Sequence, residues 1–402
     1  MEDPLARLKN GTLKLYALES EFPPVEAVRV RRNYVEAESG ADLAALGSFS
    51  IGIDRVVKRN IENMIGAVQI PVGVAGPIRV NGAHASGTYW LPLATTEGAL
   101  VASANRGASA ITRAGGAEVR ITGEGMTRAP IFAARDIVHA AEIVDWARTH
   151  HAECAAAAER TTSRGRLLSV TPYIVGTNVF LRCAYDTKDA MGMNMATIAT
   201  AEIANLVERE TGARLIALSG NMCTDKKPAA INMIEGRGRS VVAGIRLTNE
   251  QIASILKTDA RSLVEVNTRK NLIGSARAGS LGFNAHAANI VAALYLACGQ
   301  DPAHVVEGST CITTVEETED GAYIAVTLPA VQVGTVGGGT GIDTQAACLS
   351  LLGVAGGGTP EGANARAFAE IVGAAVLAGE LSLLGALAAN HLARAHQQLG
   401  RG

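Results

Sequence analysis

The hydrophobic pattern switches repeatedly between two periods within residues 130–218, and this alternation constrains the fold more than any other feature of the sequence. Four short segments are apolar or alternate between apolar and polar residues, as strands do: residues 131–134, 167–175, 179–185 and 214–218. Two longer segments have helical spacing: residues 136–159 and 191–210. The order β-α-β-β-α-β is typical of a ferredoxin-like split βαβ unit and not of a doubly wound sheet. We therefore expect an α+β protein without a Rossmann fold, in which residues 130–218 form an inserted small domain.

The remaining sequence is expected to form a large domain and a short N-terminal segment, since 402 residues suffice for two or three domains. Residues 1–48 have the pattern of helices broken at Pro23-Pro24, and residues 49–129 and 219–402 would join into the large domain. We expect this domain to be mostly helical, with a capping box at Thr248-Asn-Glu-Gln251. Residues 289–298 are apolar on all sides, which predicts a buried central helix that ends beside Asp301.

The composition favours a soluble, cytoplasmic protein. With 36 basic and 38 acidic residues, the chain lacks the basic excess of a nucleic-acid-binding protein. The six cysteines occur singly, which favours reduced thiols over disulfides or a zinc cluster, and we expect no metal. The N-terminus has no apolar run of the signal-peptide type. Residues 367–392 are apolar but interrupted by Glu370, Glu380 and Asn390, so we expect a pair of core helices and no membrane span.

Three adjacent charged residues, Asp225, Lys226 and Lys227, interrupt an otherwise apolar stretch. They lie between the apolar residues 215–218 and a Pro-Ala-Ala-Ile continuation. A lysine in such a position can be desolvated, held by a neighbouring carboxylate and directed at a developing oxyanion. A solvated turn with a surface ion pair is the alternative for the triplet taken alone. The chain contains no G-x-G-x-x-G, Walker A, G-x-S-x-G or H-E-x-x-H motif, so none of these chemistries competes.

Four segments together resemble 3-hydroxy-3-methylglutaryl-coenzyme A (HMG-CoA) reductase, in a soluble form similar to the catalytic portion of the membrane-type class. The segments are residues 94–107, 219–232, 299–301 and 391–396. The resemblance extends from about Glu62 to His396. It implies the NADPH-dependent, four-electron reduction of HMG-CoA to mevalonate and free coenzyme A through mevaldehyde, the committed step of isoprenoid synthesis by the mevalonate pathway.

The resemblance implies roles for individual polar residues. Lys226 would stabilise the oxygen that turns negative, Glu97 would protonate the mevaldehyde oxygen, and Asp301 would tune both. His396 would protonate the departing thiolate. The substrate-binding residues would be Arg128, Ser219, Asp225, Lys227, Lys270 and Asn289, and the coenzyme A contacts would be Glu62, Asn63, Asn105 and Arg106. From the residues alone, Glu97 is expected to be a buried acid, Glu62 could instead cap a helix, and Arg106 could pair with an acid in the core.

The cofactor-binding residues are also implied by the resemblance. Asp189-Ala-Met-Gly-Met-Asn-Met195 is similar to the family's dinucleotide-binding motif and falls where a strand leads into a helix, so amides at a helix start could meet a pyrophosphate. These residues would act with the glycine loop, residues 334–340, whose glycines permit a ligand to approach closely. Ser163-Arg164 resembles the pair that holds the 2′-phosphate of NADPH, with Arg166 as the alternative. The implied cofactor-binding residues are Ser163, Arg164, Asp189, Met191, Gly192, Met193, Asn194, Gly337, Gly338, Gly339 and Thr340.

Two segments depart from the family's pattern. The segment Gly279-Ser-Leu-Gly-Phe283 has one glycine fewer than usual. After Asp301, the chain has Pro302-Ala-His304-Val-Val-Glu307 where many members carry Ala-Ala-Gln-Asn. Neither departure removes a matched catalytic position.

Other functions remain open at this point. The same enzyme could run in the mevalonate-degrading direction with NAD, or the chain could be a non-redox coenzyme A thioester lyase or hydrolase that uses Glu97 and Lys226. A catalytically inactive binding or assembly protein would be expected to lack at least one of the four catalytic positions, and all four are present. The resemblance further implies self-association to a dimer or tetramer, with the active site at the dimer interface.

Overall fold

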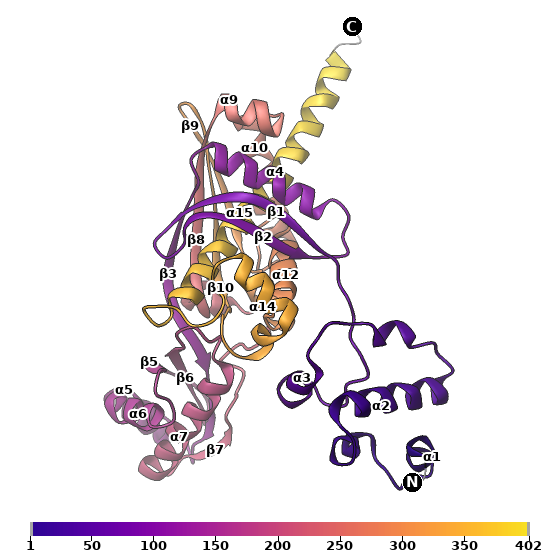
Figure 1. Ribbon diagram of the computed structural model, residues 1–402. Coiled ribbons are helices and arrows are strands. Elements are labelled where there is room, and N and C mark those ends of the chain that lie inside the picture. Colours follow the sequence, from indigo (N-terminus) through magenta and orange to yellow (C-terminus); the bar gives the residue numbers. More distant parts are fainter. Residues whose placement is uncertain (1–2, 400–402) are drawn as a thin grey trace.

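The computed structural model describes residues 3–399, with side chains described as far as Ala389. The N-terminal helices lie to one side of the rest of the chain (Figure 1). They are α1 (Pro4–Lys9), η1 (Leu15–Ser20), α2 (Pro24–Ser39), η2 (Ala44–Gly47) and α3 (Ile53–Arg59). Pro24 begins α2, because a proline ring is compatible with the first helical turn. The predicted helical character of this segment is confirmed.

Within residues 3–399, ten strands form one hydrogen-bonded sheet, and six of them belong to its larger part. These six are β1 (Val72–Gly82), β2 (Ser86–Ala94), β3 (Ala117–Arg128), β8 (Gly238–Thr248), β9 (Ile312–Thr318) and β10 (Gly321–Val331). Their order is β2-β1-β3-β8-β10-β9, with β1 and β3 parallel and the other neighbours antiparallel. In the described residues of 49–129 and 219–399, more residues are helical than lie in strands, in line with the predicted helical character, but the extended sheet in this part was not predicted. β10 buries residues on both of its faces, and such a continuous apolar run does not distinguish a strand from a buried helix.

Three helices pack against this part of the sheet and share its hydrophobic core: α4 (Leu100–Arg113), α12 (Ala287–Ala297) and α15 (Ala363–Leu399). α12 is the predicted buried central helix. α15 is one helix, so the prediction of a helix pair is wrong. Its two acids do not break it, because Glu370 accepts hydrogen bonds from the amides of Ala83, His84 and Ala85, and Glu380 is bonded to amides in the same way.

Among the described residues, one helical stretch, Ala363–Ala389, is long and apolar enough to cross a membrane by length and composition. Within its most apolar window, 83% of the residues are buried inside the protein. A helix in the core of a protein can be as apolar as a membrane span. The packing of α15 against the sheet accounts for its apolar character.

The segment between β3 and β8 contains the predicted order of strands and helices. The elements are β4 (Ile131–Ala133), α5 (Ile137–Thr149), α6 (His151–Glu159), β5 (Arg166–Val175), β6 (Asn178–Asp186), α7 (Met193–Thr211) and β7 (Arg214–Ala217). The strands lie in the antiparallel order β7-β4-β6-β5 and enclose a second hydrophobic core with the three helices. The helix predicted over residues 136–159 divides at His150, whose backbone leaves the helical region. β3 and β8 are neighbours, so the chain leaves the larger part of the sheet and returns to it at one place (Figure 1).

The shorter elements complete the structure around the sheet. They are α8 (Ala230–Glu235), α9 (Asn249–Gln251), η3 (Ile252–Leu256), α10 (Ala260–Val266), η4 (Asn267–Gly274), α11 (Ser275–Ala278), η5 (Pro302–His304), α13 (Val305–Gly308), η6 (Gly338–Gly341) and α14 (Asp343–Leu351). The capping box at Thr248 is present: the Thr248 hydroxyl accepts from the amide of Gln251, and the Gln251 side chain accepts from the amide of Thr248.

Candidate active site

The charged triplet lies on the loop between β7 and α8, and this loop has an unusual backbone. Thr224 and Lys226 both have φ 57°, a left-handed conformation that residues other than glycine adopt at an energetic cost. Such a backbone persists when its surroundings hold it. The hydroxyl of Thr224 donates to the Asn232 side chain, and the amide of Lys226 donates to Glu307 Oε1 at 2.9 Å.

Lys226 and Asp301, which are far apart in the sequence, form an ion pair. Lys226 Nζ lies 2.8 Å from Asp301 Oδ2, and the two side chains are 43% and 30% exposed. The hydrogen bond to Asp301 raises the pKa of Lys226. Burial acts to raise the pKa of Asp301, but the hydrogen bonds from Lys226 and from the amide of Ala303 outweigh it and hold that pKa below its ordinary value. The pair is thus a charged lysine at an accessible position, held by a carboxylate at the predicted end of the central helix segment.

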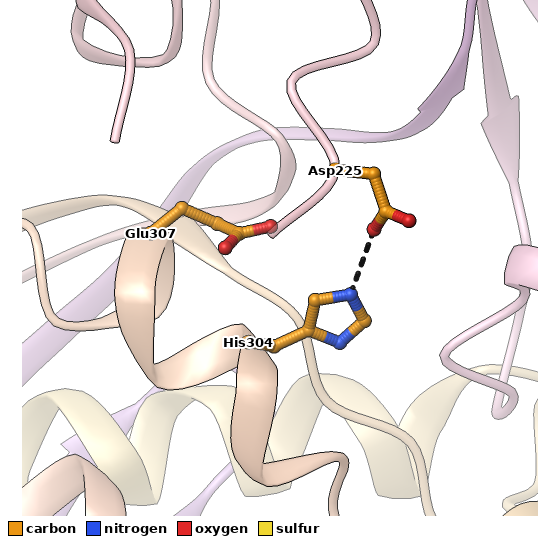
Figure 2. A group of neighbouring side chains, drawn as sticks. All are labelled: Asp225, His304 and Glu307. Atoms are coloured by element: carbon orange, nitrogen blue, oxygen red, sulfur yellow. Dashed lines mark hydrogen bonds and ion pairs between the residues drawn. The ribbon is translucent and has the colours of Figure 1, made fainter. Parts of the chain in front are cut away.

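A second cluster adjoins this pair, and of its members only Asp225 was a predicted site residue. It consists of Asp225, His304, Glu307 and the fully buried Arg237 (three of them in Figure 2). His304 Nε2 lies 3.0 Å from Asp225 Oδ1, and the Arg237 guanidinium donates to Asp225 Oδ1 at 3.0 Å and to Glu307 Oε1 at 2.7 Å. The only sequence signal for it is the departure from the family's pattern at residues 302–307.

The electrostatics of this cluster are balanced by an arginine. Burial raises the pKa of Glu307, against the hydrogen bond from Lys226 and the charge of Arg237. Burial also acts to raise the pKa of Asp225, but the hydrogen bond from His304 and the charge of Arg237 leave it well below its ordinary value. Asp225, His304 and Glu307 lie close enough together to offer three ligand atoms to a metal ion. Because the Arg237 guanidinium already contacts both carboxylates, the cluster has its cation, and we assign no metal to it.

Glu97 lies on the turn between β2 and α4 and is exposed in the single chain, so the prediction of a buried acid is wrong. The turn ends at Ala99, which has a left-handed backbone and precedes the first residue of α4. The side chain of Asn289 donates to Glu97 Oε1 at 3.3 Å. Among the described residues, no hydrogen bond or ion pair joins Glu97 to Lys226 or Asp301. His396, the fourth predicted catalytic residue, lies outside the side chains that the structure describes.

Most of the predicted substrate-binding residues gather around the loop of residues 219–227. Arg128 donates to Thr197 Oγ1 at 2.9 and 2.8 Å and lies 3.9 Å from the sulfur of Cys223. Ser219 Oγ lies 3.3 Å from the same sulfur, so Arg128 and Ser219 meet at Cys223. Lys227 Nζ donates to the carbonyl of Asp225 at 2.9 Å.

Lys270 lies apart from this group. It is exposed on the π-helical segment η4, where its Nζ donates to Asn271 Oδ1 at 3.2 Å. It lines a surface cavity of about 260 Å³ together with Leu387 and Ala388 of α15. Asn289 lies with Glu97, as described above. The single chain thus contains separate groups of predicted site residues.

The predicted coenzyme A contacts also divide. Glu62 and Asn63 follow α3 and are exposed, and Glu62 caps no described helix. Asn105 accepts a hydrogen bond from the amide of Gly76 at 3.0 Å. Arg106 donates to the hydroxyl and the carbonyl of Ser382 on α15, so its partner is a serine and not the acid considered from the sequence.

The segment that begins at Asp189 connects two parts of the chain. The buried carboxylate of Asp189 accepts hydrogen bonds from the amides of Gly358, Gly362 and Ala365, at the start of α15. The Asp189 carbonyl accepts from the amides of Thr335 and Val336, within the glycine loop. Asp189 is therefore an internal anchor of this region.

The start of α7 combines a glycine that is required by packing within the chain with helix amides that no side chain caps. Gly192 precedes α7 with φ 94°, and a Cβ there would overlap the side chain of Thr187, so only glycine fits. No side chain caps the first amides of this helix. Met191 lines a small cavity, Met193 is buried with its sulfur against Arg237, and Asn194 is exposed. In the glycine loop, Gly337 and Gly338 have positive φ, and Gly339 and Thr340 lie in the short helix η6.

The predicted 2′-phosphate residues, Ser163 and Arg164, are exposed between α6 and β5. Arg164 Nε lies 3.4 Å from Glu361 Oε1, with the two side chains 68% and 54% exposed, so this pair is weak and accessible. Arg166 is paired instead with Glu159 at 3.3 Å.

Comparisons with known proteins add an independent line of evidence. The sequence profile of hydroxymethylglutaryl-coenzyme A reductase matches residues 27–401. The chain is 57% identical over 396 residues to the 3-hydroxy-3-methylglutaryl-coenzyme A reductase of Methanothermobacter thermautotrophicus, with 98% of each chain covered. It is 54% identical over 395 residues to that of Haloferax volcanii, again with 98% of each chain covered. The match to reductase 1 of Dictyostelium discoideum is 46% identical over 408 residues and covers all of this chain and 73% of that protein.

The fold is also similar to that of a solved structure, the class II reductase of Streptococcus pneumoniae bound to NADPH in open conformations. The TM-score is 0.68 at 19% sequence identity, and the match covers 93% of this chain and 100% of that chain. At this identity, the likeness concerns the fold.

Proposed function

The chain belongs to the hydroxymethylglutaryl-coenzyme A reductase family, and from this premise we infer its reaction and the residues that carry it. It is an oxidoreductase that converts HMG-CoA to mevalonate and free coenzyme A, a reaction of the mevalonate pathway. The single observation that carries our assignment of the site is the ion pair between Lys226 and Asp301 on the loop that the sequence singled out.

In the proposed mechanism, Lys226 donates a hydrogen bond to the carbonyl oxygen that becomes negative when hydride arrives. A preorganised cation near a developing oxyanion is worth more in a desolvated site than in water. Asp301 keeps Lys226 protonated, since its hydrogen bond raises the pKa of the lysine. Glu97 delivers a proton to the mevaldehyde oxygen, with Asn289 orienting its carboxyl group at 3.3 Å. His396 protonates the leaving thiolate.

We propose that the substrate carboxylate is held by the cationic group around residues 219–227. Arg128 and Lys227 supply positive charges, and Ser219 supplies a hydroxyl. Lys270, which lies on η4 apart from this loop, is proposed to supply a third charge. Asp225 fixes the loop. Coenzyme A would be bound by Glu62, Asn63, Asn105 and Arg106, of which the last two also hold the structure internally.

NADPH is the proposed source of hydride when bound, in accordance with the ligand named for the similar streptococcal structure. The start of α7 fits the pyrophosphate of a dinucleotide, because the first amides of this helix lack a side-chain cap. We propose residues 130–218 as the cofactor-binding domain. The strand order β7-β4-β6-β5 supports a ferredoxin-like assignment of this domain. Residues 49–129 and 219–402 would form the substrate-binding domain, with residues 1–48 as a separate helical segment.

The coenzyme preference gives a specific prediction. Arg164→Ala should raise the KM for NADPH and change that for NADH little, because it removes charge-assisted hydrogen bonds that only a 2′-phosphate can make. Steady-state kinetics with both coenzymes measures this. Arg166→Ala is measured beside it, because Arg166 is the alternative 2′-phosphate residue and is paired with Glu159; a rise in the KM for NADPH in this variant alone would assign the phosphate to Arg166. Equal effects of Arg164→Ala on both coenzymes would place the phosphate site elsewhere.

The proposed reaction is tested by its stoichiometry. Two NADPH should be oxidised, and one thiol released, for each HMG-CoA consumed, because a thioester needs two hydrides to become an alcohol. Nicotinamide absorbance and thiol titration give the ratio in one assay. A ratio of one with accumulating mevaldehyde, or thiol release without NADPH oxidation as in a lyase or hydrolase, would contradict it.

We further propose a cytoplasmic enzyme that works as a dimer or tetramer in the reductive direction. The alternative, oxidation of mevalonate with NAD, would appear as the faster direction at physiological concentrations of the reactants.

A further inference from the structure

One short turn holds the loop that carries Lys226 at three separate points. The turn consists of η5 and α13, residues 302–308, with Asp301 directly before it. Asp301 contacts the Lys226 side chain, His304 contacts the Asp225 side chain, and Glu307 accepts the Lys226 backbone amide. The first contact is part of the proposed catalytic group. The other two fix the backbone behind it, and nothing in the proposed reaction accounts for them.

The contacts of Glu307 suit a positioning role. One oxygen, Oε1, accepts both the Lys226 amide at 2.9 Å and Arg237 at 2.7 Å, while Oε2 is buried without a hydrogen-bond partner. A carboxylate that leaves half of its bonding capacity unused is costly to bury. The presence of this carboxylate at a fully buried position is explained by the bond that it makes to the Lys226 backbone.

That bond acts on a conformation that would otherwise relax. Lys226 has φ 57°, which costs a non-glycine residue on the order of 1 kcal/mol or more. Freed from Glu307, the backbone would move toward an ordinary region and turn Nζ away from Asp301. A displacement of about 1 Å in a catalytic group can cost roughly 10²-fold in rate.

His304 provides the second restraint from the same turn. Its Nε2 bonds to Asp225 Oδ1, and its Nδ1 is buried without a partner (Figure 2). Since Asp225 carries an ionised carboxylate facing Arg237 and His304, the ring donates from Nε2. This bond fixes the residue directly before Lys226.

We propose that Glu307 and His304 are positioning residues for Lys226: they hold the backbone of residues 225–226 in the conformation that presents the lysine amino group to the substrate. The Arg237 guanidinium balances the charges of Glu307 and Asp225. This inference rests on the proposed role of Lys226.

The test compares variants that keep and remove the hydrogen bond. Glu307→Gln retains an oxygen at Oε1 and replaces only the unpartnered Oε2, so kcat should fall less than about 3-fold. Glu307→Leu removes the acceptor, and kcat should fall roughly 10- to 100-fold while the KM for NADPH stays constant. His304→Gln, which can still donate to Asp225, should likewise retain far more activity than His304→Ala. The control is Glu370→Gln, another fully buried carboxylate that accepts backbone amides, on α15, and its kcat should match the wild type.

Two further measurements separate positioning from general stability. Hydrogen exchange followed by mass spectrometry should show faster exchange of the Lys226 amide in Glu307→Leu but not in Glu307→Gln or Glu370→Gln. In the Lys226→Ala background, Glu307→Leu should lower the residual rate less than 2-fold, because a residue that acts through Lys226 has nothing left to position.

Each failure has a distinct meaning. If Lys226→Ala keeps most of the activity, the proposed role of Lys226 is wrong. If Lys226→Ala is inactive but Glu307→Leu lowers the rate by the same factor in both backgrounds, the positioning role is wrong. If Glu307→Leu does not fold, the comparison of His304→Gln with His304→Ala decides, and equal losses in both overturn the proposal.

Discussion

Asp301 extends the pH range over which Lys226 stays charged, and this effect can be measured by varying the pH. The hydrogen bond to Asp301 raises the pKa of Lys226, so the lysine stays protonated to higher pH than it would alone. Its contribution to stability is complete below its unfolded pKa and is lost as pH rises through the folded pKa. The lowered pKa of Asp301 works in the opposite direction, and its contribution is lost as pH falls through that value. The pair therefore contributes across the neutral range.

We predict that Asp301→Asn shifts the alkaline limb of the kcat profile to lower pH, because the amide cannot raise the pKa of Lys226. The rate at neutral pH should also fall. A pH series of kcat for the variant and the wild type measures both effects. Coincident alkaline limbs would mean that Lys226 is not the group that titrates there, or that Asp301 does not control it.

Single residues of the candidate site could be predicted where a short segment of sequence marks them, and residues that matter through their contacts with distant segments could not. Lys226 and Asp301 could be identified from their segments, and the structure brings them together at 2.8 Å. His304, Glu307 and Arg237 could not, because their importance arises from contacts between distant segments, and a sequence by itself does not state which segments meet. Glu97 looked buried because its neighbours in sequence are small, yet a turn exposes it.

At the scale of elements, the small residues of α4 allow a close contact with α15. A Cβ on Gly107 would overlap the carbonyl oxygen of Ala378, so the two helices meet at a distance that only glycine permits. The same surface includes the hydrogen bonds from Arg106 to Ser382. The Asn105-Arg106-Gly107 sequence thus holds the helix against the core as well as offering proposed coenzyme A contacts.

We predict that Gly107→Ala destabilises the protein by about 1–3 kcal/mol, since overpacking forces the helices apart. Chemical denaturation followed by circular dichroism gives the free energy of unfolding. Gly123→Ala is a suitable control, because a Cβ at Gly123 would meet its nearest neighbour at 3.5 Å, an ordinary contact. Equal stabilities of the two variants would contradict the close contact between α4 and α15.

The elements differed in how far the sequence determined them. Residues 130–218 have amphipathic helices and short strands, so their periods were legible and their order is as predicted. β10 lies inside the sheet and buries residues on both of its faces, most clearly at residues 328–331, which weakens the alternation that identifies a strand. The sequence did not predict α15 as one continuous helix, because Glu370 and Glu380 interrupt its apolar pattern. The amides that satisfy Glu370 lie in another segment, residues 83–85.

For the whole molecule, the arrangement within one chain supports an active site built from two chains. Lys226 with Asp301 and Glu97 with Asn289 form separate pairs, and both Lys226 and Glu97 are exposed in the single chain. A second copy could complete each half. In a twofold dimer, each of two equivalent sites would then take residues from both chains.

We predict that mixing inactive Lys226→Ala chains with inactive Glu97→Gln chains restores activity. A hybrid dimer would contain one site with both wild-type residues, so random mixing should recover on the order of a quarter of wild-type activity. Native mass spectrometry establishes that hybrids form, and either variant mixed with itself serves as the control. Hybrids without activity would mean that each chain builds its own site.

The adjacency of β3 and β8 also has a consequence for the order of folding. The hydrogen bond between Glu124 of β3 and Arg239 of β8 joins residues 115 positions apart. Pairing of these two strands therefore closes a long loop, and such non-local pairing is slow. The intervening residues have a hydrophobic core of their own, with Phe132 and Ile203 among its fully buried members. Early formation of this core would bring the ends of β3 and β8 close together, so the two strands would pair faster. A cavity made there, as in Ile203→Ala, should therefore delay refolding of the distant sheet, although no residue of that sheet has changed.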